Sequence, residues 1–349
     1  LANFTEIGSF EVNDGAAEDI FIHNKTLYVF DEYNDLLRRL DISNPSDIIE
    51  RSSIEMIFAN NNNTYENDQM VANDNNLFFT TFDSTMSWSS STIKVFDVSD
   101  SSIISEVSQY TTDNTIVALA IDGNHIFAAG YDYDNQQHSL EIINIENISN
   151  LYSAALMNFS ALFNNRLPMH MIINGSILYF LNIDETNGFP GYINFSVIDI
   201  SDINNPVQLG EINLSNICCG MGMTYADDAV YIANDGIYKV SIADPNNPYL
   251  LSTYNTGETW FDNLLADNPF LYTAESSIMR VLSLNSMNEK GYADIGGYQL
   301  DMNDDHFIFQ SGAQGLYIFD KVEPEVTTIP ILDQVMDEDQ ELIISLSAQ

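Results

Sequence analysis

Two hydrophobic patterns alternate along the chain, separated by polar turns. In the first, an alternating strand, a polar turn and an aromatic-rich strand follow one another, at 19–30, 69–80, 118–129, 170–181, 222–233, 263–274 and 299–310. In the second, an apolar run ends in a turn rich in Asp, Ser, Asn and Pro and a short apolar run leaves it, at 40–54, 96–110, 143–156, 198–212, 240–254, 282–295 and 318–324. Alternation with period two between turn residues predicts β-strands, and no stretch has sustained helical periodicity.

The two patterns together form a repeat. Equivalent positions in successive copies are Asp41, Asp97, Asn144, Asp199, Ser241, Ser283 and Asp320. They recur at intervals of roughly 37 to 56 residues, which is typical of propeller blades. Each full copy holds four short strands. The sequence therefore predicts an all-β protein, a seven-bladed β-propeller of four-stranded blades.

The two ends of the repeat region complement each other. The seventh copy lacks its fourth strand, while the chain opens with FTEIGSF at 4–10, which resembles the outer strand VQLGEI at 207–212. We expect the N-terminal strand at about 4–10 to complete blade seven, because this closes the ring and removes two exposed sheet edges.

The phrase VIDISDINNP at 197–206 is the most regular copy of the second pattern. We expect Asp199, Ser201 and Asp202 to cap its turn by bonding backbone amides, on the face opposite the long loops. The phrase resembles the LVIVD repeat of bacterial and archaeal surface proteins, most closely in IDISDINNP and SIADPNNP. The resemblance covers residues 1–322. It implies a secreted or cell-surface propeller, and it implies no catalytic activity.

The composition changes after Val322. Residues 323–349 contain two prolines, an acidic cluster and then an alternating strand. The portion ILDQVMDEDQELIISLSA is similar to the opening of immunoglobulin-like or cadherin-like repeats in large bacterial surface proteins. We expect two domain regions: the propeller at 1–322, and a linker with the truncated start of a following β-domain at 323–349. The alternative is a strand docked on the propeller.

The charge balance excludes some partners. The chain has 51 acidic and 10 basic residues and a net charge of −41. Nucleic acid is disfavoured, because phosphate binding needs clustered Lys and Arg. No apolar run reaches the roughly 18 residues of a membrane-spanning helix, so direct membrane insertion is not expected. The acidity favours solubility and mutual repulsion in a salty extracellular setting, and it also makes cation binding a hypothesis.

Four carboxylates are candidates for a metal site at the mouth of the central channel. Glu18, Asp19, Asp68 and Asp262 belong to the starts of innermost strands in blades one, two and six. Carboxylates that converge on one axis repel each other, and a Ca²⁺ or Na⁺ ion would relieve that repulsion. A solvated mouth without an ion is the alternative, and no cofactor is required for the fold.

Long aromatic loops over blades two to four are the best candidates for ligand binding. The candidate residues are Trp88, Tyr131, Tyr133, Phe189 and Tyr192. Aromatic side chains on long loops of a rigid scaffold can form a platform for sugar rings or a peptide. The alternative is that they pack inside their own loops. The adjacent Cys218 and Cys219 form either a vicinal disulfide, which an oxidising compartment would favour, or two reduced thiols.

The sequence contains none of four common site motifs: the G-x-S-x-G nucleophile elbow of hydrolases, the P-loop, the H-E-x-x-H motif of zinc proteases and the C-x-x-C-H haem site. The sequence therefore favours a binding or scaffolding module of a large cell-surface protein, with a protein or glycan ligand, over an enzyme. A polysaccharide-active enzyme that uses the mouth carboxylates is one alternative. A structural unit that self-assembles into a surface layer or filament is the other.

Overall fold

The computed structural model describes most of the repeat region and leaves out several loops and the C-terminal segment. The described residues are 2–3, 6–11, 17–31, 34–56, 69–82, 90–132, 137–158, 166–184, 192–214, 222–255, 261–275, 278–294, 297, 299–302, 306–311 and 315–320. The expected linker and following domain at 323–349 lie outside them. Among the described residues, no helix is long and apolar enough to cross a membrane.

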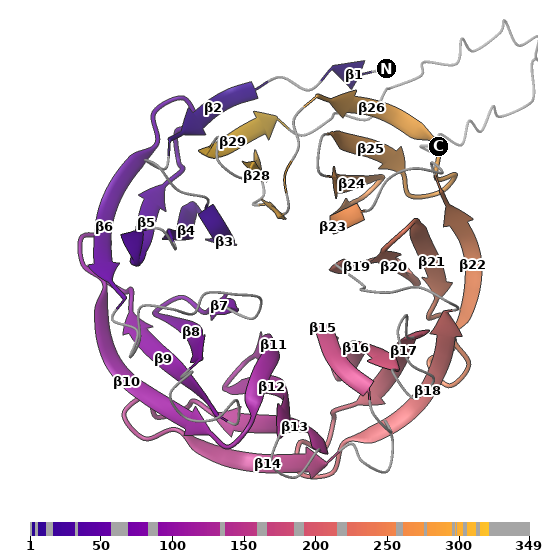
Figure 1. The fold of residues 1–349 in the computed structure, drawn as a ribbon, viewed down its shortest axis with the longest axis horizontal. Helices are drawn as coiled ribbons and strands as arrows, with labels where there is room; N and C mark the ends of the chain where they lie inside the picture. Colours follow the sequence, from indigo (N-terminus) through magenta and orange to yellow (C-terminus); the bar gives the residue numbers. More distant parts are fainter. Residues whose placement is uncertain are drawn as a thin grey trace, which may run out of the picture.

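The described strands form six four-stranded sheets and one five-stranded sheet around a central axis (Figure 1). Five of the sheets are each built from four consecutive strands. They are β3 (Ala17–His23), β4 (Thr26–Asp31), β5 (Leu36–Asp41) and β6 (Ile49–Glu55); β7 (Met70–Ala72), β8 (Asn76–Phe82), β9 (Ser91–Asp97) and β10 (Ser105–Thr112); β11 (Thr115–Asp122), β12 (His125–Asp132), β13 (Gln137–Asn144) and β14 (Tyr152–Asn158); β15 (Arg166–Asn174), β16 (Ile177–Asp184), β17 (Tyr192–Asp199) and β18 (Val207–Leu214); and β19 (Gly222–Ala226), β20 (Ala229–Ala233), β21 (Ile237–Ser241) and β22 (Tyr249–Tyr254).

The other two sheets combine strands from both ends of the chain. One contains β23 (Phe261–Asp267), β24 (Phe270–Glu275), β25 (Met279–Ser283) and β26 (Glu289–Ala293), with β1 (Ala2–Asn3) added in parallel to β26. The other contains β27 (Leu300–Met302), β28 (His306–Ser311) and β29 (Gly315–Asp320), with β2 (Glu6–Phe10) antiparallel to β29. The first strand of each sheet lies near the axis and the last at the rim (Figure 1). The predicted all-β propeller of four-stranded antiparallel blades is confirmed, as is the pairing of the N-terminal strand with the last strand.

In four sheets, the tight turn between the first and second strands contains a residue with positive φ. Gly123 and Gly175 supply it in two sheets, with φ of 53° and 59°. Asn24 and Asp227 occupy the same turn position elsewhere, with φ of 57° and 53°. These residue types tolerate the left-handed region better than others do, which explains the recurring Asn, Asp and Gly at this point of the repeat.

The predicted capping of the turn after β17 is confirmed for Asp199 and Asp202, whereas Ser201 takes part as the donor to Asp199. Asp199 Oδ1 accepts a hydrogen bond from the Ser201 amide at 2.8 Å, and Asp202 Oδ1 accepts one from the Asn204 amide at 3.1 Å. The bond from the Ser201 amide, together with one from the Ser201 hydroxyl, holds the pKa of Asp199 below its usual value. Asp41 and Asp97 cap the equivalent turns through Ser43 and Ser99. The most regular phrase of the sequence is thus a structural turn.

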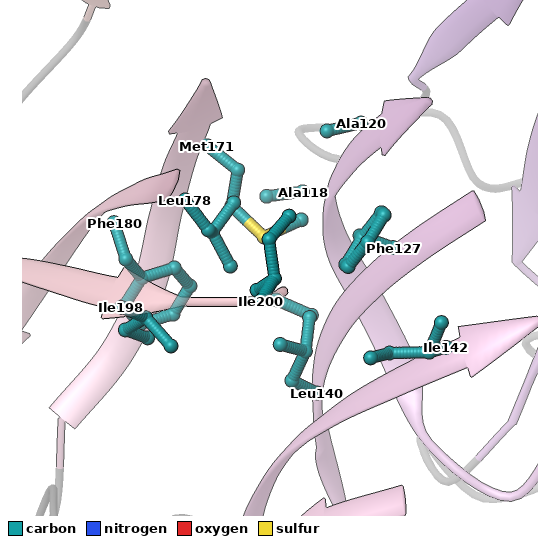
Figure 2. Close-up of a cluster of buried hydrophobic side chains, with 11 residues drawn as sticks. Ala118, Ala120, Phe127, Leu140, Ile142, Met171, Leu178, Phe180, Ile198 and Ile200 are labelled. Atoms are coloured by element: carbon teal, nitrogen blue, oxygen red, sulfur yellow. The ribbon is translucent and has the colours of Figure 1, made fainter. Parts of the chain in front are cut away.

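The hydrophobic core lies between neighbouring sheets. Figure 2 shows one cluster, in which Phe127, Leu140 and Ile142 of one sheet face Leu178 and Phe180 of the next. Similar clusters occur between other neighbours, and Leu316 and Ile318 of β29 join Ile20 and Leu27 across the ring closure. Each sheet therefore buries both faces, which explains why its middle strands read as nearly continuous apolar runs.

Polar side chains reinforce the seam between β27 and β3. The open edge of β3 would leave backbone amides without partners. The Ile20 amide donates to Gln299 Oε1 at 2.7 Å, and the Ile22 amide donates to Asp301 Oδ2. The Asp301 side chain is partly buried, and this burial raises its pKa to about 7 although the amides of Ile22 and Met302 favour its charged form.

Two outer-strand glycines let the neighbouring sheet approach closely. A Cβ on Gly8 of β2 would overlap the carbonyl oxygen of Pro45, in the turn before β6. A Cβ on Gly210 of β18 would lie 2.6 Å from the carbonyl oxygen of Pro245, in the equivalent turn before β22. The glycine in FTEIGSF and the one in VQLGEI thus both leave room for a proline carbonyl of the neighbouring sheet. This shared requirement gives a physical reason for the resemblance of the two strands.

Two basic side chains join neighbouring sheets in an equivalent way. Each lies over a tyrosine ring of its own sheet and donates to a backbone carbonyl of the next sheet's turn. The two sets are Arg39 with Tyr28 and the Asp100 carbonyl, and Lys239 with Tyr231 and the Leu284 carbonyl. The donor–acceptor distances are 2.6 Å and 2.7 Å. Two of the chain's 10 basic residues therefore stabilise contacts between adjacent sheets of the ring.

Candidate functional site

The strands that carry the predicted binding loops end together on one face. The loops after β8, β12 and β16 start and finish at the paired residues Phe82 and Ser91, Asp132 and Gln137, and Asp184 and Tyr192. These strands belong to three consecutive sheets along the chain. Regular antiparallel pairing up to the last residues gives each loop a rigid base.

The predicted aromatic residues fall mainly on the loops themselves. Trp88, Tyr133 and Phe189 lie outside the described residues. Tyr192 is the first residue of β17, and only its backbone is described. Tyr131 is half-exposed near the end of β12, opposite Thr115 and His138. The aromatic platform therefore stays a prediction, with Tyr131 as its one member whose surroundings are described.

A polar seam continues the apolar cluster of Figure 2 toward these loops. Leu178 and Phe180 of β16 face the β11–β14 sheet, so alternation places Asn182 on the same side. Tyr131 likewise follows Phe127 and Ala129 on the facing side of β12. Seam residues are thus presented by both sheets directly below the loop ends. We call Tyr131, Asn182, Asn194 and Ser196 the loop-side seam.

The amide of Asn182 is the most unusual group in the loop-side seam. Its side chain is fully buried, and neither its nitrogen nor its oxygen has a hydrogen-bond partner. Asn194, its cross-strand neighbour, is also fully buried but donates to Asn213 Oδ1 at 2.6 Å and accepts from Ser196 Oγ at 3.0 Å. Buried polar groups are normally paired, so an unpaired amide is a candidate to meet a bound group.

Sequence reasoning missed Asn182 and Asn194 as site residues. Both sit in runs that have the pattern of ordinary strand positions. A signal did exist: three asparagines, Asn182, Asn194 and Asn213, interrupt the apolar strands of one repeat. Only the strand register shows that Asn182 and Asn194 are opposite each other, and likewise Asn194 and Asn213.

The predicted metal ligands are only partly described. Glu18 and Asp19 belong to β3, where only their backbone is described, and Asp68 is outside the described residues. Asp262 of β23 is half-buried. Among the described residues, no group of three or more His, Cys, Asp or Glu side chains could hold a metal ion. The mouth site for Ca²⁺ thus remains a prediction.

Asp262 lies in an acidic environment near the end of β24. Burial raises its pKa to about 6, and the negative charge of Glu275 adds to the effect. Glu275 is almost fully buried and accepts a hydrogen bond from Arg280 Nε at 2.8 Å, while Arg280 Nη1 also bonds Glu289 at 2.6 Å. The same arrangement recurs as Asp31, Arg38 and Glu50 in the β3–β6 sheet.

Replacing Glu275 with glutamine should lower the pKa of Asp262. Removing the neighbouring charge favours the ionised form of Asp262, but burial, the larger cause, remains. We therefore expect a pKa that falls and still exceeds the usual value, measured by carboxyl ¹³C NMR titration. Glu289→Gln is the matched control, because it removes an acid that also bonds Arg280 yet does not raise the pKa of Asp262. An unchanged pKa in Glu275→Gln would contradict this account.

The remaining candidates concern sulfur and histidine. Cys218 and Cys219 lie outside the described residues, so their disulfide stays a prediction. His170 follows the bulge in β15, and its Nδ1 is buried without a hydrogen-bond partner. Burial lowers the pKa of His170 to about 4, so this imidazole is neutral at physiological pH.

Comparisons with solved structures support the fold. The chain is similar to the WD40 β-propeller domain of Doa1, with TM-score 0.65, 10% identity and coverage of 93% of this chain and 99% of that one. It is also similar to the computationally designed Ika8 protein, with TM-score 0.57, 11% identity and coverage of 90% and 99%. At such low identity the likeness shows the propeller fold alone. A scan against protein-family models gives no match, and a search of curated proteins gives none either.

Proposed function

We propose that this chain is a seven-bladed, LVIVD-like propeller that serves as an extracellular binding module of a larger cell-surface protein. The six four-stranded sheets and the five-stranded sheet match the seven repeats of the sequence. The acidic surface suits a salty extracellular setting. The ligand is a glycan or a protein segment that binds over the β7–β18 sheets.

One observation carries this proposal: the long loops of three consecutive sheets start from rigid strand ends on a single face. Aromatic residues on these loops suit sugar rings, which stack on apolar ring faces and leave their hydroxyls to polar groups. The loop-side seam supplies such polar groups, since the Asn182 amide can both donate and accept.

The test is an array of immobilised oligosaccharides, followed by titration of the strongest glycan. Trp88→Ala and Tyr131→Ala should each weaken binding by about tenfold or more, since an aromatic contact contributes on the order of 1 to 2 kcal/mol. Tyr292→Ala is the matched control, because Tyr292 is an exposed tyrosine on the outer strand β26. Glycan binding that neither loop variant weakens, or no binding to any glycan, would contradict a glycan ligand at this face.

A second function is favoured by one specific group. The raised pKa of Asp262 is what a general acid needs, and a neighbouring carboxylate is present in Glu275. A polysaccharide-active enzyme would then lose turnover in Asp262→Asn or Asp68→Asn while keeping its fold. Turnover that survives both substitutions would rule out catalysis by the mouth carboxylates.

A further inference from the structure

The outer strand β22 is an exposed apolar edge. It is the last strand of its sheet and, among the described strands, pairs with β21 alone. Its sequence is YLLSTY, and Tyr249, Leu250 and Leu251 are 51%, 42% and 47% exposed. Three consecutive exposed apolar residues on an edge strand present both apolar surface and a row of backbone groups to another strand.

Most of the other outer strands carry an acidic residue, which opposes pairing between two copies of the same acidic chain. The acidic residues concerned are Glu6 in β2, Glu50 and Glu55 in β6, Glu106 in β10, Glu211 in β18 and Glu289 in β26. β22 has no charged residue. The outer strand β14 has none either, but its exposed apolar residues, Tyr152 and Leu156, are separated by three smaller or more buried ones. The continuous apolar run is on β22.

The neighbouring rim strand β26 shows where an added strand can pair. β1 pairs with Gly291 and Tyr292, directly after the bulge of β26. β22 has its bulge at the same point of the repeat, and its Ser252 and Thr253 face Lys239 and Tyr238 as Gly291 and Tyr292 face Val281 and Arg280. Ser252 and Thr253 therefore have the position at which this fold already accepts a further strand.

We propose that β22 is a self-association edge, at which two copies of this chain pair antiparallel through their β22 strands. A two-fold axis makes one uncharged strand complementary to itself. A partner of opposite charge would be drawn to the acidic surfaces, whereas two chains of net charge −41 can approach most easily where neither presents a carboxylate. This rim contact is separate from the proposed ligand face and leaves that face open.

The proposal predicts dimerisation that depends on salt. The Debye length, beyond which repulsion between two acidic chains is largely screened, is about 3 Å at 1 M salt and about 30 Å at 0.01 M. In sedimentation equilibrium, the full chain should therefore be monomeric at low salt and dimeric at about 2 M NaCl. A monomer under both conditions would overturn the proposal, whether the edge then takes a strand of another protein or none.

Variants locate the contact. Leu250→Lys places a positive charge on the paired edge of each copy and removes an exposed apolar side chain from it, so association at high salt should weaken by about tenfold or more. Leu156→Lys is the matched control, because Leu156 is an equally apolar and 55% exposed residue on the other uncharged rim strand. Circular dichroism checks that both variants fold. Equal weakening by the two variants, or no weakening by Leu250→Lys, would overturn the assignment to β22.

Discussion

Replacing Gly8 with alanine is expected to lower the free energy of unfolding by about 3 kcal/mol, because a well-packed contact cannot accept an added methyl group without backbone movement. The new Cβ would overlap the Pro45 carbonyl oxygen. Gly8 lies in β2, the strand that closes the ring against β29. The substitution therefore acts on the ring closure, and urea denaturation should show it directly.

Two comparisons test that explanation. Ser9→Ala is the control on the same strand, since Ser9 is exposed, and it should change the free energy of unfolding by less than about 0.5 kcal/mol. Limited proteolysis should release the N-terminal segment faster from Gly8→Ala than from the parent chain. If both variants are equally stable, close approach of Pro45 is not what requires glycine at this position.

Replacing Asp301 with asparagine is expected to stabilise the protein at pH 8. Burial raises the pKa of Asp301 to about 7 in the folded protein, above its ordinary value of 3.8. Between about pH 4 and pH 7 the folded state thus keeps a proton that the unfolded state has lost, so stability falls as pH rises through this window. Avoiding the buried charge is worth about 4 kcal/mol at pH 8, from the size of the pKa shift. Asparagine has one acceptor oxygen for the amides of Ile22 and Met302, which costs about 2 kcal/mol, so we expect a net gain on the order of 2 kcal/mol.

The difference between Asp301→Asn and the parent chain should grow from pH 5 to pH 8. Free energies of unfolding measured by denaturation at several pH values give this difference. Asp320→Asn, at the exposed end of β29, is the control that removes a carboxylate without relieving burial. A difference that does not change with pH would contradict the account, since it would mean that the Asp301 carboxyl is charged throughout in both states.

Much of the fold could be predicted because it is written in local patterns. Period-two alternation places the strands, and turn residues such as Gly123 and Asp199 mark their ends. The pairing of the N-terminal strand with β29 could be predicted because FTEIGSF repeats the pattern of VQLGEI, including a glycine that both strands need. The addition of β1 to β26 was not predicted, because two residues carry no periodicity.

The candidate site was much less predictable. Long loops were recognisable by their length and aromatic content, but the loop-side seam depends on which asparagines meet across strands. Asn182 and Asn194 are opposite each other only in the register of β16 and β17. The perturbed acids were equally hidden, since nothing in the local sequence shows that Asp262 lies near Glu275 or that Asp301 meets the Ile22 amide.

The sequence by itself determined that this protein is a ring of repeated antiparallel sheets, because strand periodicity and turn chemistry are properties of neighbouring residues. Tertiary structure alone decided the roles of individual polar residues. Whether an asparagine is buried without a partner, a carboxylate holds a proton near neutral pH, or a rim strand remains open depends on contacts between segments far apart in the chain. Burial and charge depend on distances in space between such segments, and the repeat pattern of the sequence does not specify these distances.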